Sequence, residues 1–144
     1  MAGIACLALT ACDNDDDDAV NSVAPTASRM ELITSTNWTL VSSDEIAFND
    51  LPDALKTSPF SRDDIFRFKA NGEAVRDEGP TKEEGKPQIV EVARWSFLNQ
   101  ERNLDAGFKS LPLNDEIVEL TKRRMVLRRL VGNTEKLTVF EAQF

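Results

Sequence analysis

Residues 65–72, Ile-Phe-Arg-Phe-Lys-Ala-Asn-Gly, constrain the fold more than any other segment of the chain. Phe66, Phe68 and Ala70 alternate with Arg67 and Lys69, which is the period-two pattern of a strand with one apolar face and one polar face. The Asn-Gly pair that follows predicts a type I′ hairpin, in which both turn residues have positive φ. The segment therefore indicates antiparallel strands joined by tight turns.

The same alternation continues through the rest of the chain, and no segment after residue 62 keeps a helical period of 3.6. Consecutive strands joined by short turns favour an up-and-down antiparallel sheet, and closing that sheet removes its two exposed edges. We therefore expect an all-β fold, a small closed barrel of about eight strands, with a two-sheet sandwich as the alternative. The expected strands are residues 38–43, 65–70, 73–75, 88–98, 102–106, 116–121, 124–131 and 134–144.

Three connections carry weaker signals. Residues 29–36 predict a helical turn with Met30 and Ile33 on one side. The loop at residues 49–61 suggests another helical turn through Leu51, Ala54 and Leu55. Residues 107–114 are expected to form a turn-rich connection around Pro112, since proline is uncommon within strands.

The first eleven residues are uncharged and mostly apolar, as in the h-region of a secretory signal peptide, and they are too short to span a bilayer. Leu9-Thr10-Ala11-Cys12 follows this run and resembles the lipobox of bacterial lipoproteins. The resemblance implies cleavage before Cys12 and lipid on that cysteine, so that the membrane is the first partner. The alternatives are a chance match and an anchor at Cys6. The absence of Lys and Arg before the apolar run leaves open whether the signal peptide is truncated.

The run Asp13-Asn14-Asp15-Asp16-Asp17-Asp18 follows directly, and such a block of like charge is expected to stay extended and solvated. It resembles the acidic signal that routes some Gram-negative lipoproteins to the outer face of the outer membrane. A plain spacer is the equal alternative, and a calcium site has less support because the run lacks the glycine and distal glutamate of an EF-hand loop. We expect a signal peptide at 1–11, a lipidated, disordered acidic tether and linker at 12–36, and the barrel at 37–144.

Composition excludes several classes of function. Both cysteines, Cys6 and Cys12, lie in the leader, so no disulfide is expected within the barrel. Five of the eight net negative charges lie in the acidic run, which leaves the remainder at −3 and argues against nucleic-acid binding. The chain has no His and no Tyr, which excludes Ser-His-Asp and Cys-His catalysis. We therefore expect no enzyme, no metal and no cofactor.

Clusters of charge are expected on the surface. Neighbouring residues on a strand point to opposite faces, so the pairs Asp44-Glu45, Asp63-Asp64 and Glu83-Glu84 make poor catalytic dyads. A second cluster is basic and is interpreted mainly as the solvated rim of a hairpin, with an anion site as the alternative. Its members are Lys122, Arg123, Arg124, Arg128 and Arg129.

The order of several weak motifs over residues 37–142 resembles the lipocalin-like domains of secreted bacterial lipoproteins. These motifs are Asn37-Trp38-Thr39-Leu40, Phe66-Arg67-Phe68 with Asn71-Gly72, Arg94-Trp95-Ser96-Phe97, Met125-Val126-Leu127 and Val139-Phe140-Glu141. One departure is Thr36, which stands where true lipocalins have the glycine of Gly-x-Trp. The resemblance implies either a small apolar ligand at the barrel mouth or a protein-binding or inhibitory role, in the cell envelope at the outer membrane. Exposure on the cell surface is left open.

The candidate ligand-lining residues follow from the same strands. They are Trp38, Leu40, Phe66, Phe68, Glu91, Trp95 and Phe97. The alternative is that the aromatic rings only fill the barrel. Glu91 shares the apolar phase of its strand, so it is expected either to contact a ligand or to lie near an open end, because burying it without a partner is costly.

Overall fold

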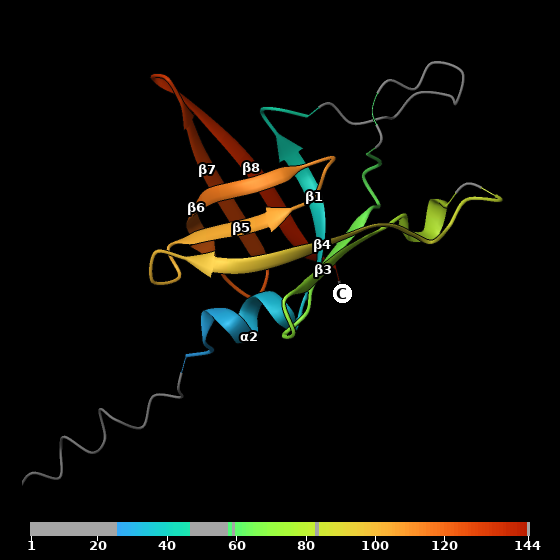
Figure 1. Cartoon of the computed structure of the whole chain (residues 1–144), viewed down its shortest axis with the longest axis horizontal. Coiled ribbons are helices and arrows are strands. Elements are labelled where there is room, and N and C mark those ends of the chain that lie inside the picture. Colours follow the sequence, from blue (N-terminus) through green and yellow to red (C-terminus); the bar gives the residue numbers. More distant parts are fainter. Residues whose placement is uncertain (1–25, 47–57, 59, 83, 144) are drawn as a thin grey trace, which may run out of the picture.

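A computed structural model, which describes residues 26–46, 58, 60–82 and 84–143, shows a closed barrel of eight antiparallel strands (Figure 1). Each strand pairs with the next along the chain, and the last pairs with the first. The predicted all-β, up-and-down barrel is therefore confirmed, and the sandwich is not formed. The strands are β1 Asn37–Ser43, β2 Ile65–Phe68, β3 Glu73–Asp77, β4 Ile89–Leu98, β5 Asn103–Gly107, β6 Pro112–Leu120, β7 Arg124–Val131 and β8 Thr134–Gln143.

The helix α2, Arg29–Thr34, packs against the end of the barrel where β1 begins, and it confirms the helical turn predicted there (Figure 1). Its start is a capping box: Ser28 Oγ accepts from the Glu31 amide at 3.1 Å, and the Glu31 carboxylate accepts from the Ser28 amide at 2.7 Å. Ile33 is fully buried, and its carbonyl accepts from Trp38 Nε1 at 3.1 Å. The helix is therefore tied to the barrel by both packing and a hydrogen bond.

The hairpin between β2 and β3 forms where it was predicted, but the type I′ turn is wrong. Gly72 has φ of 87°, whereas Asn71 does not have positive φ. The Gly72 amide donates to the Lys69 carbonyl at 3.0 Å, and the Lys69 amide donates to the Glu73 carbonyl at 2.7 Å. This is a type I turn followed by a left-handed glycine. Asn71 Oδ1 instead accepts from the Glu73 amide at 3.0 Å, a local role that asparagine often takes in turns.

Two of the remaining connections differ from the expected ones. Pro112 is not in a turn, because it is the first residue of β6, a position where a strand tolerates proline. The helical turn expected through Leu51, Ala54 and Leu55 lies outside the described residues. The short 3₁₀ helix η2, Gly79–Thr81, was not predicted and lies in the connection between β3 and β4.

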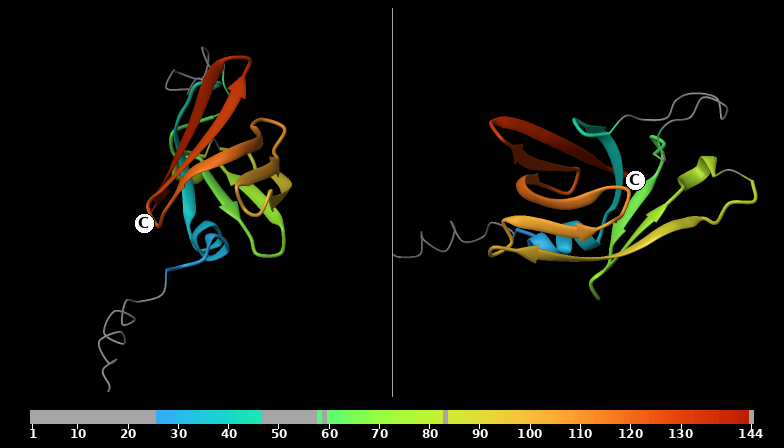
Figure 2. Two further views of the ribbon diagram at one scale, coloured as in Figure 1. Left: turned by 90° about the vertical axis from the view of Figure 1, so that its left-hand side faces the viewer. Right: turned by 45° about the horizontal axis from the view of Figure 1, so that its top comes forward.

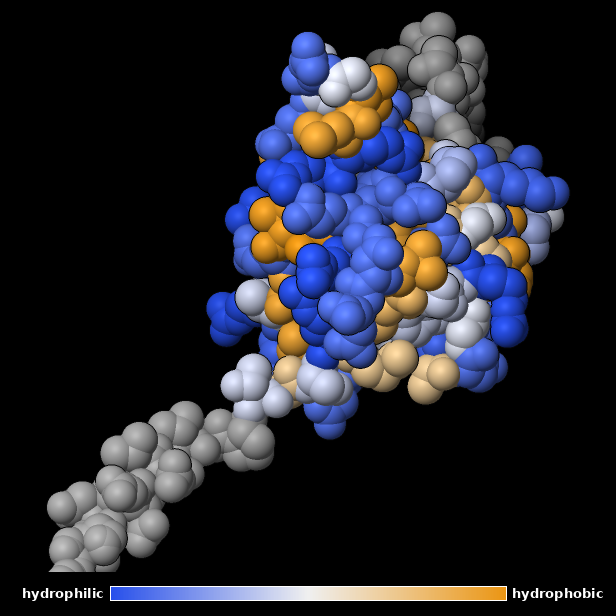
Figure 3. Space-filling model, turned by 60° about the vertical axis from the view of Figure 1, so that its left-hand side comes forward, coloured by the Kyte–Doolittle hydropathy of each residue, from blue (hydrophilic) through white to orange (hydrophobic). Residues whose placement is uncertain are grey.

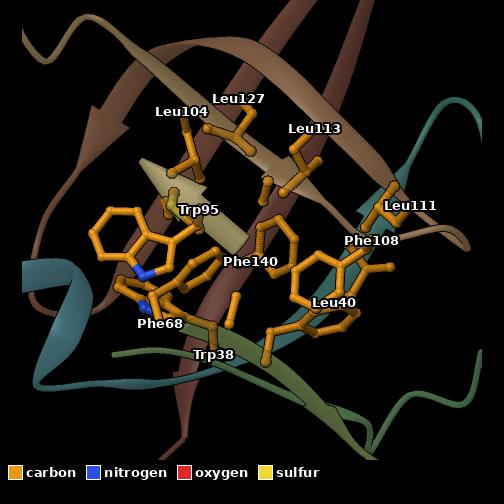
Figure 4. Packing of buried hydrophobic residues seen from close by; sticks show 14 of the residues in the cluster. Trp38, Leu40, Phe68, Trp95, Leu104, Phe108, Leu111, Leu113, Leu127 and Phe140 are labelled. Carbon is orange, nitrogen blue, oxygen red and sulfur yellow. The ribbon is translucent and has the colours of Figure 1, made fainter. Parts of the chain in front are cut away.

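The inward faces of the strands meet in one apolar core (Figure 4). The ring of Phe66 meets those of Phe108 and Phe140 edge-on, each with centroids 5.4 Å apart. Such edge-to-face contacts are the favoured packing of aromatic rings. The largest side chains that are almost completely buried are Trp38, Phe60, Phe66, Phe68, Phe108, Phe140, Ile33, Leu40, Leu104, Leu113, Met125 and Leu127. These side chains come from opposite sides of the barrel and pack against one another across its interior.

Candidate functional site

The structure divides the predicted ligand-lining residues into two groups. Four of them, Trp38, Leu40, Phe66 and Phe68, are at most 1% exposed and belong to the packed core. Trp95 and Phe97 lie further along β4 and both line a hollow at the surface together with Met30 of α2, although Trp95, at 6% exposed, also belongs to the core. Only this second group is placed to meet a molecule from solution without opening the core.

This hollow, which we call the α2–β4 hollow, has a volume of about 400 Å³. Small-molecule sites commonly have volumes of this order, apolar walls and a few polar groups. The residues that line it are Met30, Ala70, Gly72, Trp95, Ser96, Phe97, Gln100 and Glu101.

The aromatic wall of the hollow is held in place from behind. The rings of Trp95 and Phe97 meet at 88° with centroids 5.3 Å apart, and Phe68 meets the other side of Trp95 at 5.6 Å. Trp95 Nε1 donates to the Lys69 carbonyl at 2.8 Å, which fixes the orientation of the indole. Met30 of α2, 39% exposed, supplies the facing apolar side chain.

The turn between β4 and β5 forms the remaining wall and has an unusual backbone. Asn99, Gln100 and Glu101 have φ of 54°, 59° and 65°, a left-handed region that costs an L-residue roughly 1–2 kcal/mol. Arg29 Nη1 donates to the Glu101 carbonyl at 2.6 Å and links this turn to α2. The expected strands 88–98 and 102–106 placed a connection here, but its left-handed backbone was not predicted, because the turn contains no glycine and only Asn99 belongs to a residue type enriched in this region.

A second hollow, of about 610 Å³, lies on the other side of the same turn. Its lining is polar: Asn99, Gln100, Arg102, Asn103 and Glu116. Asn99 Nδ2 donates to Asn103 Oδ1 at 3.1 Å within it. The turn therefore separates an apolar hollow from a polar one.

Glu91 faces a different part of the chain. Its carboxylate accepts hydrogen bonds from the backbone amides of Lys109 and Ser110 and from the Ser110 hydroxyl. It also lies 3.6 Å from Arg76 Nε. The carboxylate thus provides the hydrogen-bond acceptor for the chain between β5 and β6, and it lies outside the α2–β4 hollow. Its role as a ligand contact stays a prediction.

Asp64 was expected on the surface with Asp63, and that expectation is wrong. Its side chain is fully buried and accepts from Arg76 Nη1 at 2.8 Å. Burial raises the pKa of the Asp64 carboxyl to about 6, against the lowering effect of Arg76. Arg76 also lies over the Phe60 ring, with its Cζ 4.8 Å from the ring centroid. The physical reason is register: Phe66 of β2 pairs with Arg76 of β3, and Asp64, two residues before Phe66, lies on the same side of the sheet.

Three arginines of the predicted basic cluster are paired with carboxylates. This pairing favours the interpretation of the cluster as the solvated rim of a hairpin over the alternative of an anion-binding site. Arg124 Nη1 lies 3.6 Å from Glu119. Arg128 lies 2.5 Å from Glu116, and that hydrogen bond raises the pKa of its guanidinium. Arg129 Nη2 lies 2.6 Å from Asp115, which is itself buried.

Two features are absent from the part of the chain that the structure describes. In that part of the chain, no group of three or more His, Cys, Asp or Glu side chains is placed to hold a metal ion. None of its helices has the length and apolarity needed to cross a membrane. Cys12 lies outside the described residues. No protein-family model, curated protein or solved structure matches this chain.

Proposed function

We propose that this protein is a lipid-anchored lipoprotein of the cell envelope with a lipocalin-like barrel that binds a small apolar molecule in the α2–β4 hollow. The observation that carries the proposal is the apolar hollow itself, which lies outside a barrel whose interior is occupied by rings. The barrel then acts as a rigid support, and the ligand contacts are Trp95, Phe97 and Met30. Trp38, Leu40, Phe66 and Phe68 support the site only indirectly.

The anchor is proposed from the sequence. Leu9-Thr10-Ala11-Cys12 provides the lipidation signal, and residues 13–18 provide an acidic spacer. Several acyl chains on one cysteine anchor a protein far more firmly than one, because each buried methylene contributes about 0.8 kcal/mol. The tether would join the barrel at α2, beside the hollow.

Native mass spectrometry of the protein purified from its own host tests both parts. We expect a mass increase of acyl groups on Cys12 and a co-purifying small molecule. Ala70 lines the hollow and is exposed, so Ala70→Phe should fill the hollow and remove the bound molecule while leaving the acyl mass unchanged. Val118→Phe adds the same ring at an exposed site on β6 and serves as the control. A ligand that survives Ala70→Phe, or no ligand at all, would overturn the binding proposal.

A protein-interaction module is the second candidate, and the filled core favours it. Apolar side chains are also exposed on the outer surface, where Figure 3 shows separate apolar patches among polar residues. Leu130 and Val131, 68% and 52% exposed, lie at the tip of the β7–β8 hairpin. Crosslinking on intact cells tests this candidate, which predicts a specific protein partner and no small molecule.

A further inference from the structure

The first half of β4 has a neighbour on only one side in the described part of the chain. β3 pairs with β4 from Ile89 to Arg94, whereas β5 pairs with β4 only from Trp95 to Leu98. β5 ends at Gly107, so the β3–β4 hairpin reaches past it, as the right-hand view of Figure 2 shows. The barrel therefore closes at one end of β4 and leaves an edge at the other.

The direction of the backbone groups along this edge follows from the ladder. The Trp95 amide donates to the Gly72 carbonyl at 2.9 Å, so Trp95 hydrogen-bonds towards β3. In an antiparallel pair, residues alternate between hydrogen-bonding to one neighbour and to the other. The Val92 amide and carbonyl therefore point away from β3, towards the side on which β5 no longer pairs with β4. No described residue hydrogen-bonds to them.

The segment that follows β5 turns inward instead of continuing the ladder. Phe108 is fully buried in the core, and the Glu91 carboxylate accepts the amides of Lys109 and Ser110. The Glu91 side chain thus accepts hydrogen bonds from two amides that would otherwise pair with the backbone of a neighbouring strand. A groove of about 540 Å³ remains, lined by Val90, Glu91, Val92, Gly107, Lys109 and Ser110.

The groove is apolar along Val90 and Val92 and carries one positive charge, at Lys109. The Val92 side chain is 62% exposed, which is unusual for a valine beside an open edge. Lys109 lines the groove and is exposed, whereas the Glu91 carboxylate accepts hydrogen bonds from amides and lies 3.6 Å from Arg76 Nε. An extended segment with a β-branched or apolar centre and an acidic residue that meets Lys109 complements this arrangement.

We propose that the edge of β4 at Val92 receives an extended, acidic segment of a protein partner, which adds to the sheet as a further strand. Main-chain hydrogen bonds provide affinity in such strand addition, and the side chains provide specificity. The inference gives the second candidate function a location and rests on it. The edge is separate from the α2–β4 hollow, so ligand binding there is an independent question.

The test uses the full-length chain and two blocked hexapeptides, Asp-Thr-Val-Thr-Val-Asp and Lys-Thr-Val-Thr-Val-Lys, with amide hydrogen exchange as the measurement. In the free protein the Val92 amide is expected to exchange rapidly. The acidic peptide at about 1 mM should slow that exchange by about tenfold or more, and the basic peptide should have little effect. Lys109→Glu should reverse the preference, because the side chain of Lys109 is exposed.

Val92→Pro removes only the outward amide and should abolish peptide binding, since proline is tolerated at a strand edge whose N–H has no partner. Val92→Thr keeps the amide and should bind normally, and the melting temperatures of both variants should confirm that they fold. Protection of Val92 in the free monomer, or no protection by the acidic peptide, would overturn the proposal. Equal binding of both peptides would overturn the acidic partner. Protection that rises with protein concentration alone would replace the partner with a second copy of the chain.

Discussion

Arg76 and Asp64 form an ion pair inside the barrel, with Arg76 Nη1 2.8 Å from Asp64 Oδ2. Both side chains are almost completely shielded from solvent, and Asp64 Oδ1 has no hydrogen-bond partner among the described residues. Removing two charges from water is costly, and the attraction between them repays this only when the remaining polar atoms are satisfied. The pair is therefore a source of pH dependence rather than simple stabilisation.

We predict that the pair makes the protein less stable as the pH rises from about 4 to about 6. Burial raises the pKa of folded Asp64 to about 6, above the value of 3.8 for an exposed aspartate. In this interval the folded state binds more protons than the unfolded state, so the contribution of Asp64 to stability is present at low pH and is lost through pH 6. At 1.36 kcal/mol for each pKa unit, the loss is at most about 3 kcal/mol.

Urea unfolding between pH 4 and pH 7 measures this effect. The other carboxyls also titrate, and the pKa of Asp77 is lowered by its hydrogen bonds against burial, so its contribution has the opposite sign. The informative quantity is therefore the free energy of unfolding of the wild type minus that of Asp64→Asn. We expect this difference to fall as the pH rises from 4 to 7. A difference that rises or stays flat would show that Asp64 has no raised pKa.

We predict that removing one partner of the pair is worse than removing both. Asp64→Ala removes the carboxylate that lies 2.8 Å from the buried Arg76 guanidinium and should cost about 3–5 kcal/mol of unfolding free energy. The double change Asp64→Leu with Arg76→Leu removes both charges and should cost clearly less. Denaturant unfolding at pH 7 compares the variants. Additive losses in the double variant would contradict the prediction.

The sequence predicted the strands well because each strand of a closed barrel buries one face, and alternation records that face directly. Eight strands and the position of the hairpin at Asn71-Gly72 could be inferred from local patterns alone. Local patterns could not show that Asp64 is buried, since its partner Arg76 lies twelve residues away on another strand. The left-handed backbone of the turn at Asn99–Glu101 was missed for a related reason, because it is supported by Arg29 of α2.

The candidate site was predictable only in part. Alternation placed Trp38, Phe66, Trp95 and Phe97 on the inward face, but it could not say which of them would reach a surface. That depends on where α2 lies relative to β4, and the residues of the two elements that line the hollow, Met30 and Trp95, are about 65 residues apart in the chain. The open edge at Val92 was also hidden from the sequence, since it reflects where β5 ends relative to β4.

We predict that the core rings and the hollow rings respond differently to truncation. Phe66 is fully buried against three other rings, so Phe66→Ala should lower the free energy of unfolding by about 3–5 kcal/mol. Phe97 is only partly buried, so Phe97→Ala should cost about 1–2 kcal/mol. Denaturant unfolding of both variants provides the measurement. Equal costs would mean that the core near Phe66 is not tightly packed.

We predict that the Glu91 carboxylate fixes the position of the chain between β5 and β6. This carboxylate accepts three hydrogen bonds from Lys109 and Ser110. A hydrogen bond to a charged group contributes about 1.5–3 kcal/mol to stability. Because those amides are partly solvent-accessible, Glu91→Ala should cost about 2–4 kcal/mol in total and should expose both amides to rapid hydrogen exchange. Glu91→Gln keeps one acceptor oxygen and should retain part of that protection. If Glu91→Ala left both amides protected, the carboxylate would not be what fixes this segment, and its place beside the groove would need another explanation.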